Sequence, residues 1–323
     1  MNVYEPSTFD HNQLGPVVRL TQILLNVHER VSSLKSSSIK PSIGSLDKLI
    51  FHLVNKFSVS SLREVCQREG LNIRGLNLQD KKYYLRISEE KKFLDVLLGN
   101  PYNTEFWKII LNPKNFNSPE DVESFALRIF GASVLDAKMY RADFAIDLFE
   151  DFNLTLEGLM FDNKTAHSEW VGGSSRTGLY VGTNDDKYLA YNKGLKEKVD
   201  YPWTRIERQV SGTKLPFRKF SEFRGAFNSI EKFDPLSTVH LSSVIFTEGP
   251  LSPEEQIRLQ ELKTLIKHEG IFQTQKKLNA SRNFRRDYGK LFQLVPRNQQ
   301  PKQIFDEFIK DFYKEHLWSQ STN

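Results

Sequence analysis

Residues 141 to 149 read Arg-Ala-Asp-Phe-Ala-Ile-Asp-Leu-Phe, and this segment constrains the fold more than any other part of the chain. Successive side chains of a β-strand point to opposite faces of its sheet. One face of this strand is apolar and predicts a packed core, while the other face carries ionisable groups. The apolar face comprises Ala142, Phe144, Ile146 and Leu148, and the opposite face comprises Arg141, Asp143, Ala145 and Asp147.

From residue 46 to residue 245 the chain mixes short apolar strands with amphipathic helices. Helices are predicted at Val59–Glu69, which opens with serines, and at Pro119–Ile129, where Ser118 can cap the free amides. No Gly-rich nucleotide loop follows any strand. We therefore expect an α+β fold with a largely antiparallel central sheet and flanking helices. The predicted strands are Leu46–Val54, Tyr83–Ile87, Glu105–Leu111, Met139–Phe149, Ala166–Val171, Gly178–Gly182, Lys187–Asn192, Thr204–Val210 and Thr238–Ile245.

After residue 250 the apolar spacing becomes helical throughout. Ser252 and Glu255 have the spacing of a capping box and predict the start of a helix. Further helices are predicted near Ile271–Leu278, near Phe284–Leu294 and from Pro301 to His316. The sequence thus predicts an all-helical C-terminal region.

The change near residue 248 divides the chain into regions of different character. Residues 1–44 comprise a polar tail, a predicted helix at Val17–Leu34 and a Ser/Lys-rich linker. Residues 45–248 comprise the α+β domain, and residues 249–323 the helical C-terminal region.

The formal net charge of +5 matters less than its distribution. Eight basic residues and a single acid, Asp287, lie between positions 276 and 302, so eight minus one leaves seven positive charges. Solvated helices usually mix the two signs, and this excess indicates a polyanionic partner. A basic surface without a ligand is the alternative. The basic residues are Lys276, Lys277, Arg282, Arg285, Arg286, Lys290, Arg297 and Lys302.

The single cysteine, Cys66, excludes a disulfide framework and a thiolate metal site. A chain without disulfides fits a reducing compartment, so we expect a cytoplasmic protein. The N-terminus lacks the basic and apolar blocks of a secretory signal. No run of about 18 apolar residues predicts a membrane span.

Asp143 and Asp147 share the polar face of the strand at 141–149, and the small Ala145 between them leaves room for a ligand. Two carboxylates in this arrangement repel each other unless a cation or a basic group lies between them. Their oxygens suit a hard divalent ion such as Mg²⁺ or Mn²⁺. An exposed polar face with Arg141 paired to one aspartate is the alternative.

The predicted strand Thr204–Val210 places Arg205, Glu207 and Gln209 on one face. The carboxylate of Glu207 is flanked by two groups that hydrogen-bond phosphate or carboxylate, and it is a candidate for a third metal ligand. A simple cross-strand ion pair is the alternative, and such pairs contribute little to stability.

Residues 178–192 predict a β-hairpin, and Tyr191 lies at the end of its second strand. A tyrosine hydroxyl is a poor nucleophile at neutral pH because its pKa is about 10. A cation close by, either Lys193 or a bound metal, would favour the phenolate. Tyr191 is the candidate nucleophile, ahead of its neighbours Tyr180 and Tyr188, and a packing role is the alternative.

The stretches RADFAID, LYVGTNDDKYLAYNKG and WTRIERQV, in this order, resemble the plasmid replication-initiator family often called Rep-trans. The resemblance covers residues 45 to 245 and implies that residues 45–248 form a nicking domain. It implies that a tyrosine attacks a DNA phosphodiester, which leaves a 5′-phosphotyrosyl link and a free 3′-hydroxyl that primes rolling-circle replication. The implied site residues are Tyr191, Lys193 and Arg205 for catalysis, and Asp143, Asp147 and Glu207 for the Mg²⁺ or Mn²⁺ ion.

The same resemblance implies origin DNA as the partner, in double- and single-stranded form, together with a host helicase and polymerase. A homodimer is compatible with it, and a membrane is not expected. The helix near Phe284–Leu294 would enter a groove of the duplex while basic side chains neutralise phosphates. The candidate DNA-binding residues are Lys276, Lys277, Arg282, Arg285, Arg286 and Lys290.

The His-hydrophobe-His motif of the two-histidine relaxases is absent from this sequence. His52 and His167 lie on predicted strands and are candidates to approach the site, with a core or surface position as the alternative. Three other functions stay open: a conjugative relaxase of the same family, a non-catalytic DNA-binding regulator, and a metal-dependent nuclease that uses water.

Overall fold

The structure is a computed structural model that describes residues 42–54, 57–77, 83–97, 107–162, 168–171 and 178–314. The helix expected at Val17–Leu34, the linker up to residue 41 and His167 lie outside these ranges. From Ser42 onward the chain forms one compact unit. None of the helices in the described ranges is both long and apolar enough to cross a bilayer.

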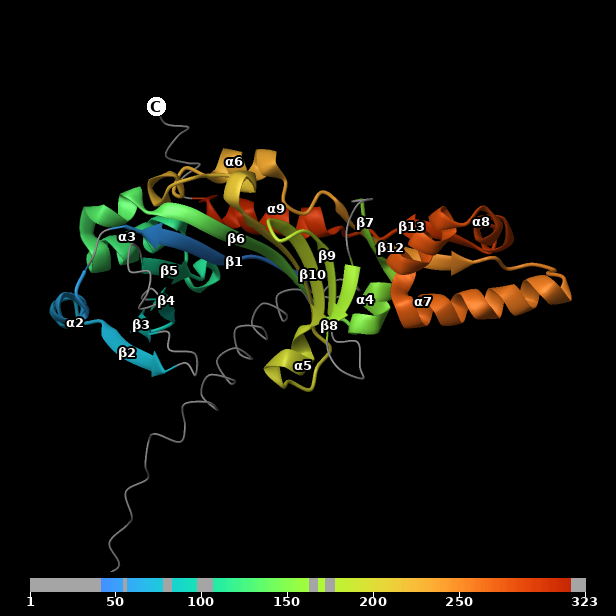
Figure 1. Ribbon diagram of the computed structural model, residues 1–323, viewed down its shortest axis with the longest axis horizontal. Helices are drawn as coiled ribbons and strands as arrows, with labels where there is room; N and C mark the ends of the chain where they lie inside the picture. Colours follow the sequence, from blue (N-terminus) through green and yellow to red (C-terminus); the bar gives the residue numbers. More distant parts are fainter. Residues whose placement is uncertain are drawn as a thin grey trace, which may run out of the picture. The chain divides into compact units, whose positions relative to one another are not determined.

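The described residues form a large antiparallel sheet with the strand order β2-β3-β4-β5-β1-β6-β11-β10-β9-β8 (Figure 1). The strand that the sequence predicts at Met139–Phe149 is β6, which pairs with β1 on one side and with β11 on the other. The strands are β1 (Ser42–Leu53), β2 (Asn72–Asn77), β3 (Tyr83–Glu89), β4 (Lys92–Leu97), β5 (Trp107–Leu111), β6 (Lys138–Leu148), β8 (Ser168–Val171), β9 (Gly178–Gly182), β10 (Asp186–Asn192) and β11 (Thr204–Ser211).

Both faces of β6 are covered between Ala142 and Leu148. Phe144 and Ile146 on its apolar face are fully buried, as their alternation predicts. Asp143 and Asp147 on the opposite face are buried as well, with 0% and 7% of their surface exposed. Carboxylates at this depth require charged or hydrogen-bonding partners, which neighbouring strands must supply.

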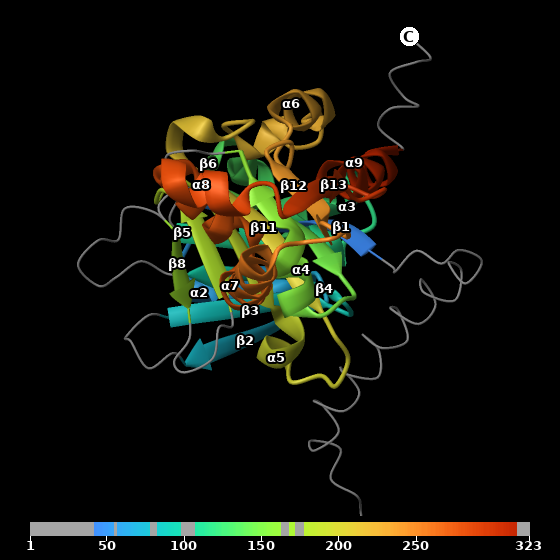
Figure 2. The same ribbon diagram turned by 90° about the vertical axis from the view of Figure 1, so that its right-hand side faces the viewer.

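Helices α6 and α9 lie on one side of the sheet and α5 on the other (Figures 1 and 2). Ser118 accepts a hydrogen bond from the amide of Asp121 and so caps α3 as predicted. The helices of this part are α2 (Val59–Arg68), α3 (Pro119–Phe130), α5 (Lys193–Glu197), α6 (Phe227–Phe233) and α9 (Pro301–Phe312), with 3₁₀ turns η2 (Pro113–Asn115), η3 (Gly131–Asp136), η4 (Gly212–Lys214) and η5 (Phe220–Glu222).

The C-terminal helix α9 packs directly against the middle of the sheet. The ring of Phe305 meets that of Phe144 edge-to-face, with centroids 5.7 Å apart. Gly44 on β1 permits this approach, because a Cβ atom there would lie 2.7 Å from the Cβ atom of Phe308. Just past the helix, the buried Tyr313 hydroxyl donates to the carbonyl of Phe223 at 3.0 Å. Helix α9 therefore belongs to the main core.

A second, smaller apolar cluster lies beside the main core. It is built on a three-stranded sheet of the order β13-β12-β7 and on the N-terminal half of α7. Its buried residues are Leu262, Ile266, Ile271 and Leu291. The lobe comprises α7 (Pro253–Ala280), α8 (Arg282–Tyr288) and β13 (Phe292–Pro296). It is joined to the main core by α4 (Phe152–Gly158), β7 (Leu159–Phe161) and β12 (Val239–Phe246), whose buried apolar residues belong to that core.

The α+β fold with a largely antiparallel central sheet and a helical C-terminal part is confirmed. One predicted element in that part is wrong in its second half: the helix expected at Phe284–Leu294 ends at Tyr288, and β13 follows it. Leu294 pairs with Val244 of β12, and both side chains pack on the second cluster. Tertiary burial thus overrides the local helical spacing.

Helix α7 contains a sharp break at Gly270, where φ is 78° and ψ is 164°. This backbone region is open essentially to glycine alone. A Cβ atom at Gly270 would also lie 2.8 Å from the carbonyl oxygen of Leu156. The break explains why the sequence predicts two helices here, with the second at Ile271–Leu278.

We expect Gly270→Ala to lower the free energy of unfolding by about 1–3 kcal/mol, because alanine is strained in this conformation. Urea denaturation followed by circular dichroism measures the change. Gly249→Ala is the matched control, since a Cβ atom at Gly249 meets nothing within 4 Å. Equal stability of the two variants would contradict the strained break.

Candidate active site

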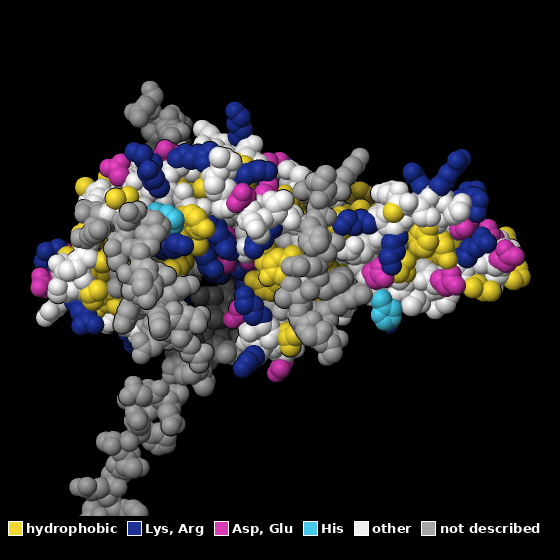
Figure 3. Space-filling view, in the orientation of Figure 1, with side chains coloured by type: hydrophobic (Ala, Val, Ile, Leu, Met, Phe, Trp, Pro, Cys, Tyr) yellow, Lys and Arg dark blue, Asp and Glu magenta, His cyan; other side chains and the backbone are white. Residues whose placement is uncertain are grey.

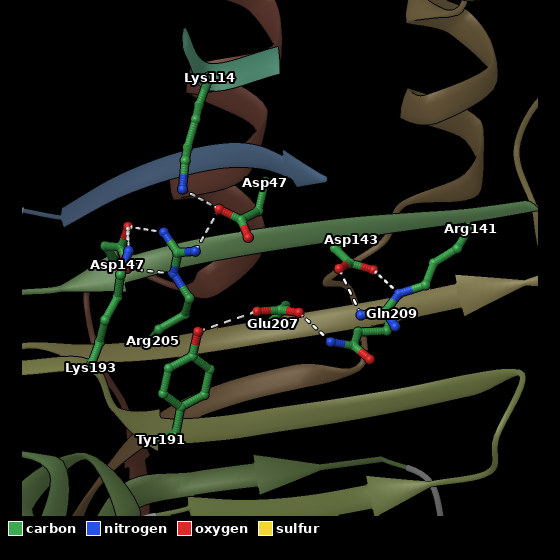
Figure 4. Close-up of polar contacts among 10 residues, drawn as sticks. All are labelled: Asp47, Lys114, Arg141, Asp143, Asp147, Tyr191, Lys193, Arg205, Glu207 and Gln209. Carbon is green, nitrogen blue, oxygen red and sulfur yellow. Dashed lines mark hydrogen bonds and ion pairs between the residues drawn. The ribbon is translucent and has the colours of Figure 1, made fainter. Parts of the chain in front are cut away.

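The candidate site lies on the polar face of the sheet, where β1, β6, β11 and β10 run side by side (Figure 4). In the antiparallel register, Arg205 stands between Asp147 on β6 and Tyr191 on β10. Glu207 stands opposite Ala145, and Gln209 opposite Asp143. Cross-strand partners share a face of the sheet, so these side chains meet on one surface.

Arg205 holds the centre of this surface through a buried ion-pair network. Its Nε and Nη2 donate to the two carboxylate oxygens of Asp147 at 2.8 and 2.5 Å, and its Nη1 donates to Asp47 Oδ1 at 2.6 Å. Lys114 contacts the same oxygen of Asp47. Burial opposes the charge on Arg205, but the attraction of both carboxylates raises its pKa well above the usual value.

The same guanidinium keeps its two acids ionised. Burial disfavours the ionised form of Asp147, yet Arg205 and then Lys193 outweigh it and lower the pKa of this carboxyl. For Asp47 the penalty of burial is likewise exceeded by Arg205 and Lys114, so its pKa falls far below the ordinary range. The network is therefore a permanently charged unit at neutral pH.

Lys193 is directed at Asp147. It begins α5 after Asn192, whose side chain caps this helix, and its Nζ lies 3.5 Å from both oxygens of Asp147. The ammonium also lies 4.0 Å from the ring centre of Trp203. Burial lowers the pKa of Lys193 to about 7, although Asp147 opposes this shift. The pairing with Asp147 is thus the role that the geometry gives to Lys193.

Asp143 is the least accessible acid of the site. Arg141, two residues earlier on the same strand, donates to both of its oxygens at 2.6 and 2.8 Å. Burial raises the pKa of Asp143 to about 6, and the nearby charge of Glu207 adds to this effect while Arg141 opposes it. Two close carboxylates of this kind favour a shared proton or cation.

Tyr191 presents its hydroxyl to Glu207. The hydroxyl donates to Glu207 Oε2 at 3.5 Å, and the side chain of Gln209 donates to the other oxygen of Glu207. Burial, and then the negative charge of Glu207, raise the pKa of Tyr191 far above its usual value. The phenol is therefore protonated at neutral pH, and Glu207 is placed to accept its proton.

A pocket of about 470 Å³ opens beside the Tyr191 hydroxyl. Lys48 and Lys196 line it, and within the described ranges neither lysine forms an ion pair; the Lys196 ammonium lies 4.9 Å from the Tyr191 ring centre. Apolar walls come from Leu179 and Leu195. The pocket thus combines a phenol hydroxyl, a carboxylate that can accept its proton, and two cations that suit a phosphate.

Of the three predicted metal ligands, the fold brings Asp143 and Glu207 together and separates Asp147 from them. Asp143 and Asp147 are four residues apart on β6, which places their Cα atoms about 13 Å apart at the usual strand rise. Asp147 is also fully engaged by Arg205. Across the described part of the chain, no three His, Cys, Asp or Glu side chains form a group that could hold a metal ion.

Several site residues escape the sequence analysis. Asp47 and Lys48 lie at an irregularity of β1, where the register with β6 shifts between Leu46 and Lys48. The signal was present, because two consecutive polar residues interrupt the alternation of that strand and are typical of a bulge. Lys114 comes from a turn far away in sequence, and no local pattern predicts its contact with Asp47.

The predicted basic cluster is partly neutralised, by two acids outside it and by its own Asp287. Lys277 pairs with Glu269, Arg286 with Asp287, and Arg297 with Glu150 on the main domain. Lys276 lies 5.3 Å from the ring centre of Phe272. Figure 3 shows acidic side chains among the basic ones on this lobe. The cations that are exposed and lack an ion pair among the described residues are Arg282, Arg285 and Lys290.

No protein-family model matches the chain, and no curated protein matches it. Among solved structures, it is similar to the rolling circle replication initiator protein from Geobacillus stearothermophilus, with 16% sequence identity, a TM-score of 0.35, and coverage of 66% of this chain and 90% of that chain. The PH1012 protein from Pyrococcus horikoshii OT3 has 9% identity, a TM-score of 0.11, and coverage of 60% and 93%. Both TM-scores are low, so we base the function on the geometry of the site.

We expect Arg205→Ala to lower the free energy of unfolding by about 3–5 kcal/mol, because the buried Asp147 loses its bidentate partner and keeps only the more distant ammonium of Lys193. Guanidinium denaturation measures the loss. Arg258→Ala removes an exposed ion pair with Glu254 on α7 and serves as the control, with little expected change. A similar small effect for both variants would show that the network contributes no stability.

Proposed function

We propose that this protein nicks one strand of DNA with Tyr191 and thereby initiates rolling-circle replication. The observation that supports this most is the Tyr191 hydroxyl at the edge of a cation-lined pocket, 3.5 Å from the carboxylate of Glu207. The resemblance of three segments to the Rep-trans initiators points to the same residues. Conjugative transfer by the same chemistry is the nearest alternative.

In the proposed reaction the phenol oxygen of Tyr191 attacks the phosphorus of a DNA phosphodiester. Glu207 accepts the phenol proton as the bond to phosphorus forms. The bond from phosphorus to the 3′-oxygen breaks, and that oxygen takes a proton from solvent and leaves as a 3′-hydroxyl. The 5′-phosphate stays linked to Tyr191. Lys48 and Lys196 neutralise the charge that develops on the phosphate oxygens.

A divalent ion remains part of this proposal, with Asp143 and Glu207 as its protein ligands; Asp143 would give up one of its two hydrogen bonds from Arg141 to bind it. Their mutual repulsion, which contributes to the raised pKa of Asp143, is the kind that a bound cation relieves. Mg²⁺ or Mn²⁺ accepts carboxylate oxygens readily and would polarise the phosphate when bound. Asp147 keeps a separate task, since it orients Arg205 and Lys193 beneath the nucleophile.

Binding of the origin duplex is assigned in this proposal to the lobe of α7, α8 and β13. Arg282 and Arg285 project from α8, and Lys290 follows it, as exposed cations suited to phosphate contacts. A host helicase, a polymerase and a second copy of the chain are further proposed partners, because a nicked origin must be unwound and copied.

We expect Tyr191→Phe to abolish nicking of a supercoiled origin plasmid in Mg²⁺ or Mn²⁺ while leaving duplex binding within about twofold. The readout is a protein–DNA adduct that survives denaturation and disappears with protease. Tyr188→Phe is the matched control: Tyr188 lies on the same strand, but its hydroxyl bonds Thr238 and its ring is buried.

Three outcomes would contradict the assignment of Tyr191 as the nucleophile that nicks DNA. Nicking by Tyr191→Phe would exclude this nucleophile. Nicked DNA without an adduct would identify a nuclease that uses water, and origin binding without any nicking by the wild type would identify a regulator.

We expect Arg285→Ala combined with Arg286→Ala to weaken binding of the origin duplex and to reduce the slope of log affinity against log salt by up to about 2, since each lost phosphate contact removes about 0.9. Fluorescence anisotropy across a salt series measures both quantities. Lys232→Ala combined with Lys310→Ala, two exposed cations on α6 and α9, is the control. An unchanged slope would remove α8 from the interface.

A further inference from the structure

A second group of side chains stands apart from the nicking site, where β5, β1 and β6 adjoin. His52 of β1 is in register with Lys108 of β5 and with Lys138 of β6. The imidazole of His52 stacks on the ring of Tyr140, with centroids 4.6 Å apart and an interplanar angle of 17°. The ammonium of Lys108 lies 4.7 Å from the centre of the same ring. We call these four residues the Tyr140 platform.

The Tyr140 platform lies on the face of the sheet that carries Tyr191. The register between β1 and β6 shifts at this point, so that Ile50 pairs with Arg141 and Phe51 with Met139. Tyr140 is the extra residue of this bulge. Met139 on the core side is buried, whereas 44% of the surface of Tyr140 is exposed. The bulge therefore turns the phenol ring away from the core and toward the polar face.

The two groups are separated by a distance that a flexible strand of DNA can span. Tyr191 is level with Arg205 and Asp147 in the sheet, and Tyr140 lies seven residues before Asp147 on β6. With two strand spacings across the sheet, the positions are about 20–25 Å apart. In the view of Figure 3, basic and hydrophobic side chains lie on both sides of a hollow in this face.

The platform combines flat aromatic rings with lysine ammonium groups, so it suits a ligand that has both an aromatic ring and negative charge. An exposed ring with a cation held over it contributes little to a core, but it is the arrangement on which nucleobases stack. Lys138 is exposed, and the nearest acid in sequence, Asp136, pairs with Lys219. Burial, together with Lys108, lowers the pKa of His52 to about 4, so its imidazole is uncharged at neutral pH and adds a second flat surface.

We propose that the Tyr140 platform binds the single-stranded DNA that leads to or from the nicking pocket, with one unpaired base stacked on Tyr140. The base displaces the Lys108 ammonium from the ring, and Lys108 and Lys138 then contact the neighbouring phosphates. A duplex does not fit this role, because its bases are already stacked on one another. That the bound strand is the one cut at Tyr191 rests on the proposed nicking function. Binding of single-stranded DNA to the platform does not require Tyr191 to react.

The test measures binding of a fluorescent single-stranded oligonucleotide that spans the nick site, in the Tyr191→Phe background so that no strand is cut. Tyr140→Ala should lower the affinity about tenfold, the usual effect of losing one stacked base. Tyr140→Phe keeps the ring and should stay within about twofold. Lys108→Ala combined with Lys138→Ala should reduce the salt slope by about 1.4, at about 0.7 per phosphate of a single strand. Lys310→Ala on α9 is the charge control.

A second measurement separates stacking from a loss of folding. An oligonucleotide series carries one abasic position that moves along the strand. One abasic position should lower the affinity of the protein that keeps Tyr140. The same abasic position should leave the affinity of Tyr140→Ala unchanged, because that variant has no ring on which the base could stack. Duplex binding by the lobe of α7 and α8 should be unchanged in every variant.

The proposal is overturned if Tyr140→Ala binds the single strand as tightly as its parent, or if every abasic position acts equally in both proteins. If Tyr140→Ala lowers duplex affinity as much as single-strand affinity, the substitution unfolds the chain. In that case the abasic oligonucleotides are measured on the protein that keeps Tyr140, and equal binding at every abasic position overturns the proposal. Failure of wild-type nicking would refute the proposed function while leaving these binding results intact.

Discussion

The charged contact of Arg205 with Asp147 and Asp47 is the constraint on which the rest of the site depends. It joins β11, β6 and the bulged part of β1, three strands that meet at the centre of the sheet. A shift of one residue in the pairing of β11 would turn Arg205 into the core and remove the main cation from Asp147 and Asp47. The network therefore specifies the register, and the register places Tyr191 beside Glu207.

This arrangement keeps the phenol of Tyr191 in its protonated form. Burial and the charge of Glu207 keep the phenol of Tyr191 protonated, although Arg205 acts in the opposite direction. In the proposed reaction a divalent ion bound by Asp143 and Glu207 would lower the pKa of Tyr191, because it offsets the negative charge of Glu207. The proposal thus links activation of the phenol to binding of that ion.

The C-terminal region contributes to two separate apolar clusters. Helix α9 completes the core beneath the polar face, whereas α7, α8 and β13 build a lobe around Leu262 and Ile266. The boundary near residue 248 therefore marks a change of composition. It does not separate two cores, because α9 packs against the main sheet again. The net positive charge of residues 276–302 is lower in the structure than the sequence count suggests. Two of the cations form ion pairs with acids outside this segment, Arg297 with Glu150 and Lys277 with Glu269.

The sequence by itself determined the elements whose signals are local. The alternation around Phe144 predicts a strand with one core-facing side, and Ser118 and Ser252 predict helix starts, because strand periodicity and capping depend on residues close in the chain. Only the tertiary structure decided which charges meet. Asp47, Lys114 and Lys48 reach the site through a bulge and a distant turn, Lys193 points to Asp147, and Leu294 joins a strand. These outcomes depend on burial and on pairing between remote segments, and no local period encodes them.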